Sequence, residues 1–163
     1  MPPPDEDLRE FLAERRYATL ATSDPEGGIH LTPVWFLFED DRFLFASFTG
    51  SKKVRNLERN PAASVVVDAR EPGRDRWVAA AGTVEILRGD EARAINARIQ
   101  SRYLTAEAIE DVRVGPVFAA GDDLTLRLTP RKWRSWTARE VDAQEFGGIL
   151  GETPERWFLP LAR

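Results

Sequence analysis

Cysteine is absent from this chain of 163 residues, and histidine occurs once, at His30. Without cysteine there are no disulfides, no thiolate nucleophile and no Cys-ligated metal or iron–sulfur centre. A single histidine also argues against a His-rich metal site and against a Ser-His-Asp triad. We therefore expect no metal site.

An excess of positive charge is missing as well, and so are long apolar runs. The net charge is −4 and the isoelectric point is about 5.2, whereas nucleic acids and anionic membranes select basic surfaces. No apolar run approaches the roughly 20 residues of a membrane span, and the acidic start, MPPPDEDLREF, is unlike a signal peptide. We expect one cytoplasmic domain with a sizeable core and no nucleic-acid or membrane partner.

The apolar pattern predicts a mainly β protein. Alternating or continuous apolar stretches predict strands over 17–22, 29–39, 42–48, 63–67, 77–87, 124–129 and 133–136. Capping residues and helical spacing predict short helices near 5–16, 51–60, 90–103 and 105–112. Evenly spaced strands with one helical insert favour a small antiparallel barrel.

The stretch 29–39, IHLTPVWFLFE, is apolar on both of its predicted faces. A strand of this kind is usually covered on both sides. In a hairpin protein, this pattern predicts a barrel interior on one side and a subunit interface on the other. Pro33 cannot donate to a ladder, so it predicts an edge or a bulge where a ligand can approach the backbone.

The segment GSKKVRNL predicts a helix that begins on unfavourable charges. Ser51 is a good N-cap, but Lys52, Lys53 and Arg55 follow it, and the chain has only one other lysine. Each cation in a first turn costs about 0.3–1 kcal/mol unless an anion binds there. The alternative is a solvated basic turn, but the conflict with the helix dipole and the apolar hairpin before it favour an anion site. The Walker A spacing is missing.

The order of motifs HLTPVWF, FLFAS and GSKKVRNL, followed by Asn60-Pro61, resembles the pyridoxamine 5'-phosphate oxidase-like superfamily. Its members are split β-barrel proteins that bind a flavin or the deazaflavin F420 across a homodimer interface. PVWF and KVRNL are most similar to the F420-dependent branch. The resemblance implies a homodimeric, FMN-binding split barrel over 1–137, with an extension over 138–163 packed on the same domain.

The resemblance also implies a cofactor site with three groups of residues and one further residue, Trp77. The phosphate contacts are Ser51, Lys52, Lys53 and Asn56. The ring is lined by Thr32, Pro33, Val34 and Trp35, and the chain of the cofactor is flanked by Ala46 and Ser47. Trp77 falls where the flavin oxidases carry a polar residue from the partner strand.

The sequence departs from the classical oxidases on the second strand. Those enzymes carry basic residues at positions that correspond here to Leu31 and Phe36, so the departure disfavours pyridoxamine-phosphate oxidation and tight FMN binding. We expect F420 in preference to FMN. The resemblance implies an oxidoreductase that transfers hydride or electrons to or from a small organic substrate. The chemistry is the cofactor's own, and we assign no catalytic residue.

Two functions of other classes stay open. One is a flavin-binding module without turnover, which would retain FMN or F420 and reduce no acceptor. The other is a haem-handling protein with His30 as the iron ligand. Iron ligation by His30 predicts a Soret band that His30→Ala removes.

Overall fold

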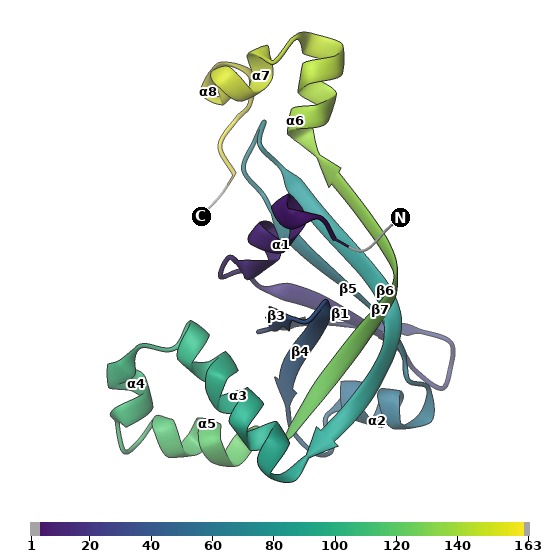
Figure 1. The fold of residues 1–163 in the computed structure, drawn as a ribbon, viewed down its shortest axis with the longest axis vertical. Helices are drawn as coiled ribbons and strands as arrows, with labels where there is room; N and C mark the ends of the chain where they lie inside the picture. The colour runs from purple at the N-terminus through teal and green to yellow at the C-terminus, as the bar shows by residue number, and fades with distance from the viewer. Residues whose placement is uncertain (1–3, 162–163) are drawn as a thin grey trace.

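Seven strands form a single antiparallel sheet in the computed structural model, which describes residues 4–161 (Figure 1). The strands are β1 (Ala18–Ser23), β2 (Ile29–Val34), β3 (Leu37–Glu39), β4 (Arg42–Ser47), β5 (Ala62–Ala69), β6 (Arg76–Arg88) and β7 (Leu124–Thr137). Their order across the sheet is β2-β1-β5-β6-β7-β4-β3. The fold is therefore mainly antiparallel β, as the sequence predicts.

The remaining elements are helices, most of them short. They are α1 (Glu6–Ala13), α2 (Lys52–Arg59), α3 (Gly89–Tyr103), α4 (Ala106–Glu110), α5 (Gly115–Gly121), α6 (Ala138–Val141), the π-helix η1 (Asp142–Phe146), α7 (Ile149–Glu152) and α8 (Pro154–Trp157). The sequence did not predict α5 or the helices after residue 137. Within residues 4–161, no helix combines the length and the apolar character needed to cross a membrane.

The two edge strands, β2 and β3, are neighbours in the chain but lie at opposite edges of the sheet. Only Trp35 and Phe36 separate them, so the sheet has to curl until its edges almost meet. It is nevertheless not closed by hydrogen bonds. The prediction of one continuous strand over 29–39 is wrong for this reason: the chain switches edges at Trp35-Phe36.

Tyr103, at the end of α3, satisfies the backbone at this crossing. Its hydroxyl accepts from the N–H of Phe36 at 3.2 Å and donates to the carbonyl of Arg16 at 2.5 Å. Buried backbone groups require hydrogen-bond partners. Here the hydroxyl of Tyr103 provides hydrogen bonds that a neighbouring strand would otherwise provide. The crossing is thereby fixed between β1 and α3.

Two aspartates form the turn between β3 and β4, and a glycine allows a register shift between β6 and β7. Asp40 and Asp41 both have positive φ, 49° and 55°, the conformation of a type I′ hairpin turn between β3 and β4. The strands predicted over 124–129 and 133–136 are one strand, β7, whose register against β6 shifts at Gly82. A Cβ at Gly82 would lie 2.0 Å from the carbonyl oxygen of Thr129, so only glycine fits there.

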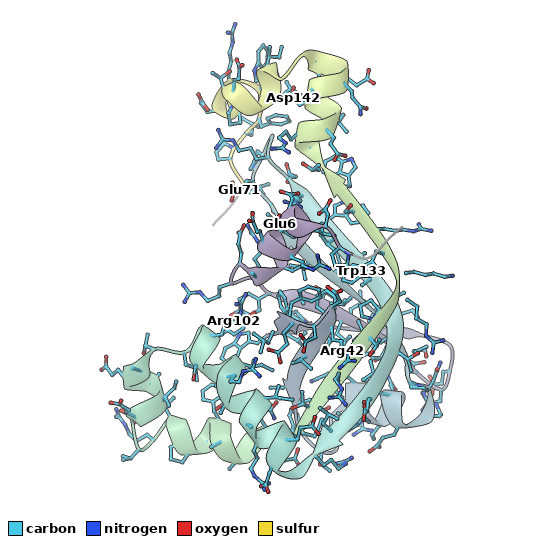
Figure 2. The ribbon with its side chains drawn as sticks, viewed as in Figure 1. Glu6, Arg42, Glu71, Arg102, Trp133 and Asp142 are labelled. Atoms are coloured by element: carbon cyan, nitrogen blue, oxygen red, sulfur yellow. The ribbon has the colours of Figure 1, made fainter. Side chains whose placement is uncertain are left out.

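The core lies inside the curl of the sheet. Fully buried Phe36, Phe43 and Phe45 pack there with Leu124 and Trp133, and Figure 2 shows Trp133 on β7, beside the interior of the curl. A smaller apolar cluster joins α3 to the outside of the sheet through Leu44, Leu87, Ile95 and Ile99, with Trp35 and Tyr103 packed against it.

The C-terminal helices lie at the far end of β6 and β7, away from α3–α5 (Figure 1). Asp142 is buried among them (Figure 2) and accepts from the N–H groups of Leu150 and Gly151 at 3.1 and 2.7 Å. Arg74, on the β5–β6 turn, donates to the carbonyl of Gly151. The division of the chain at residue 137 into a barrel and an extension stays a prediction.

Candidate functional site

A hollow of about 260 Å³ lies between the end of β2, β4, the start of α2 and the end of α5. The side chains that line it are Tyr17, Pro33, Val34, Trp35, Ala46, Ser47, Phe48, Lys53, Phe118 and Asp122. Six of these belong to the predicted cofactor site: Pro33, Val34, Trp35, Ala46, Ser47 and Lys53. Three separate stretches of the chain thus meet in one place.

Trp35 forms an aromatic wall of the hollow. Its ring stacks on Tyr103, with the centroids 5.0 Å apart and the planes at 1°, and on Phe118, at 5.7 Å and 20°. Offset stacks at these distances are favourable by about 0.5–1.5 kcal/mol each beyond the area they bury. Because Tyr103 is itself anchored at the strand crossing, the indole is held as a rigid flat surface.

Lys53 supplies the cation of the hollow. Its ammonium lies 5.5 Å from the centroid of the Phe48 ring, and within residues 4–161 it makes no ion pair. Partial burial lowers the pKa of Lys53, and the negative charge of Asp122 only partly opposes this effect. A desolvated cation without a paired carboxylate is a favourable place for a ligand anion.

Lys52, its neighbour in the chain, is placed differently. Its ammonium lies 3.6 Å from Asp24. Asp24 accepts from the N–H groups of Gly28 and Glu26, and the hydrogen bond from Gly28 is the main reason that its pKa is lowered. Lys52 is exposed and does not line the hollow. The two lysines at the start of α2 therefore have different electrostatic surroundings.

Asp122 is the acidic member of the hollow and was not predicted. It caps the C-terminal end of α5, and its carboxylate accepts from the side-chain amide of Gln100 at 3.2 Å. Burial raises its pKa, although the Gln100 hydrogen bond and the charge of Lys53 act in the opposite direction. The hollow thus contains one partly buried cation and one partly buried carboxyl group.

Five residues of the predicted set lie outside the lining. Ser51 caps α2, with its hydroxyl 3.4 Å from that of Ser47, and Asn56 is buried and donates to Thr22 at 3.1 Å. Thr32 is hydrogen-bonded to His30 at 2.8 Å. Lys52 pairs with Asp24, and Trp77 lies on β6 opposite Asp68 and Trp136. Their roles as cofactor contacts stay predictions.

Tyr17, Phe48, Phe118 and Asp122 line the hollow and were missed from the sequence. Phe48 directly follows the predicted Ser47, so the end of the β4 apolar run was a usable signal. Phe118 and Asp122 come from a stretch without a recognisable motif, and no local pattern marked them.

A larger hollow of about 430 Å³ lies between the β5–β6 turn and the C-terminal helices. Several of its charged side chains have partners: Arg76 pairs with Asp7 at 2.6 Å, Arg74 binds the carbonyl of Gly151, and Asp142 accepts two backbone N–H groups. None of the predicted site residues lines it. The smaller hollow is therefore the stronger candidate for a ligand site.

Exposed apolar side chains occur on the lining of the smaller hollow and along the edge strand β2, whose end contributes Pro33 and Val34 to it. Ile29 and Leu31, on the edge strand β2, are 65% and 61% exposed, and Tyr17 and Phe48 on the lining are 62% and 50% exposed. Large apolar patches on a protein surface mark interaction sites. One side of the hollow is thus bordered by a surface suited to a protein contact.

Comparison with known proteins identifies a family for this chain. The family model described as pyridoxamine 5'-phosphate oxidase matches residues 4–137. A search of curated proteins finds no match.

Several solved structures share the fold. A conserved hypothetical protein, Rv2991 from Mycobacterium tuberculosis, is 26% identical with a TM-score of 0.70, over 85% of this chain and 87% of that one. A protein described as an F420 reductase is 26% identical with a TM-score of 0.64, over 80% and 98%. The haem storage protein HutZ from Vibrio cholerae, at 18% identity and a TM-score of 0.62 over 82% and 93%, is similar in fold alone. From the match over residues 4–137, the chain belongs to the pyridoxamine 5'-phosphate oxidase family.

Proposed function

We propose that the chain is an oxidoreductase that binds F420, in preference to FMN, at the smaller hollow and exchanges hydride or electrons with a small organic substrate. One observation carries the proposal: Lys53, without an ion-pair partner in residues 4–161, faces the same hollow as the stacked indole of Trp35. A cation beside a flat apolar wall fits a ligand with an anionic group and a planar ring.

Each part of the hollow has a distinct task in this proposal. Lys53 binds the phosphate of the cofactor. Trp35 and the backbone at Pro33 orient the ring, with Ala46 and Ser47 along the chain between them. A bound deazaflavin or flavin supplies the redox chemistry, while the protein supplies orientation and exclusion of water. The fixed crossing at Phe36 keeps the ring wall in place.

The preference for F420 rests on charge and on similarity. The second strand carries the apolar residues Leu31 and Phe36 where the resemblance to the classical oxidases calls for cations. The F420 reductase, at 26% identity, is similar over 80% of this chain. F420 is long and anionic, so it needs cations beyond Lys53, and exposed Arg55, Arg131 and Lys132 are candidates.

The site is completed, in this proposal, by a second copy of the chain. Sites for small molecules and cofactors usually measure about 300–1,000 Å³, whereas the hollow of one chain is about 260 Å³. The exposed Ile29 and Leu31 lie on the same edge strand as Pro33, and burying them against a partner would both stabilise a homodimer and help to enclose the remainder of the cofactor. Trp77 of a partner is then a candidate contact.

Turnover tests the proposal. The purified protein is mixed with reduced F420, and separately with reduced FMN, and then with a panel of small organic acceptors while oxidation of the cofactor is followed by absorbance. We expect oxidation that depends on both protein and acceptor and is lost in Lys53→Ala. Tight binding with no oxidation by any acceptor would instead favour a flavin-binding module without turnover.

A further inference from the structure

Asp122 and Lys53 face the same hollow but do not form an ion pair. Both side chains line it, both are half-buried, and no contact of 4.0 Å or less joins them. The carboxylate of Asp122 is instead turned to the side-chain amide of Gln100, at 3.2 Å. The space between the two charged groups is open to a ligand.

An anion bound at Lys53 would share this small volume with the carboxyl group of Asp122. Two negative charges in a partly dehydrated space repel more strongly than they would in water. Asp122 also ends α5, and the C-terminal end of a helix carries a partial negative charge. The surroundings of Asp122 therefore favour its neutral form once a second anion arrives.

We propose that Asp122 controls anion binding in the hollow: a ligand anion binds beside Lys53 only with the carboxyl group of Asp122 protonated, so that binding takes up a proton wherever this group is ionised in the free protein. The inference rests on the proposed function, in which Lys53 binds the phosphate of the cofactor. It adds a residue of the helical insert to the binding site and makes cofactor affinity depend on pH.

Three neighbours act on the charge of Asp122. Lys53 from α2 and the amide of Gln100 from α3 stabilise the carboxylate, while Asp123, the next residue, destabilises it. Asp123 is exposed and accepts from the N–H and the hydroxyl of Thr49 at 2.7 and 2.6 Å, so it is turned away from the hollow. An anion at Lys53 screens the positive charge that, together with the Gln100 hydrogen bond, favours the ionised form of Asp122.

The sign of the pH dependence follows from these charges. The pKa of Asp122 is already raised in the free protein by burial, and a bound anion raises it further. Below the free-protein pKa, the carboxyl group is neutral in both states and affinity does not change with pH. Between the free and the bound pKa values, affinity falls as the pH rises, by up to about tenfold per pH unit for one proton.

Sulfate is a suitable probe because it stays doubly charged over the range of interest, unlike a phosphate monoester. Its affinity for the full chain is measured by NMR titration of the backbone amides that line the hollow, at a series of values between about pH 5 and pH 8. We expect the affinity of the wild type to fall across this range. Asp122→Asn should show a flat profile and bind sulfate about tenfold more tightly than the wild type at the highest pH.

Asp123→Asn is the matched control, because it removes the same charge one residue along the chain and should keep the wild-type profile. Asp122→Asn also removes the charge that raises the pKa of Lys53, but losing protons from Lys53 weakens anion binding, which is opposite to the tighter binding expected for this variant. A flat wild-type profile, an equal slope in Asp122→Asn, weaker binding in that variant, or no sulfate binding at any pH would each overturn the proposal. The cofactor titrations that test the proposed function are a separate measurement with its own outcome.

Discussion

The hollow has two walls of different origin. The strand wall, made of Pro33, Val34, Trp35, Ala46, Ser47 and Lys53, comes from β2, β4 and the start of α2. The helical wall, made of Phe118 and Asp122, comes from the end of the α3–α5 insert. The strand wall carries the residues that the family resemblance identifies, whereas the helical wall carries none of them.

The two walls also differ in what positions their residues. Residues of the strand wall are positioned by ladders and by the crossing at Trp35-Phe36, so their geometry is tied to the fold. Phe118 and Asp122 are positioned by packing and by hydrogen bonds to α3, where Gln100 donates to the carbonyl of Phe118 and to Asp122. We interpret the strand wall as the part of the hollow that binds the cofactor, and the helical wall as the part that modifies the affinity for it.

The largest expected effect concerns the exposed edge of the strand wall. Leu31→Asp would bury a carboxylate in the proposed homodimer contact, at a cost of several kcal/mol. We expect light scattering to show a monomer, and cofactor affinity to fall with the loss of the partner. Val112→Asp is the control, because Val112 is 85% exposed on the insert and should leave the dimer intact. A dimeric Leu31→Asp protein would refute the proposed interface.

A smaller effect distinguishes the two lysines at the edge of the strand wall. Lys53→Ala removes a charge-assisted phosphate contact and should weaken cofactor binding by more than about 1.4 kcal/mol, or tenfold. Lys52→Ala should change affinity far less, because Lys52 is exposed and paired with Asp24. Fluorescence titration measures both. Equal losses of cofactor affinity in the two variants would indicate that the phosphate contacts both lysines at the start of α2 and does not bind inside the hollow.

The smallest effect concerns the helical wall. Phe118→Ala removes its stack on Trp35 and the apolar area that the ring buries, and should lower the free energy of unfolding by at least about 0.5–1.5 kcal/mol, as measured in urea. Cofactor affinity should stay within about twofold of the wild type. Val117→Ala, at a neighbouring site that is 66% exposed, serves as the control. A loss of cofactor affinity as large as that of Lys53→Ala would indicate that the helical wall also binds the cofactor.

The family resemblance identified the residues of the strand wall, and local sequence patterns predicted the cap of α2 and the edge position of Pro33. Ser51 does cap α2, accepting from the N–H of Val54, and the first turn of α2 contains no acidic residue. Pro33 does lie on an edge strand, β2. Each of these features can be recognised within a window of a few residues.

Determinants that lie far apart in the chain escaped prediction. The break at Trp35-Phe36 depends on Tyr103, which is 67 residues away from Phe36, and the uniform apolar character of 29–39 concealed it. α5 spans only seven residues, GPVFAAG, with glycine at both ends. A segment of that length is too short to be a stable helix alone and depends on its contacts with α3.

Binding of a flavin-type cofactor in the smaller hollow is the central claim. Side-by-side titration of the apoprotein with F420 and FMN, followed by fluorescence, tests it most directly. We predict saturable binding of F420 that is tighter than binding of FMN, and at least about tenfold weaker binding of F420 by Lys53→Ala. If neither cofactor binds, or if Lys53→Ala binds F420 as tightly as the wild type does, the claim is contradicted.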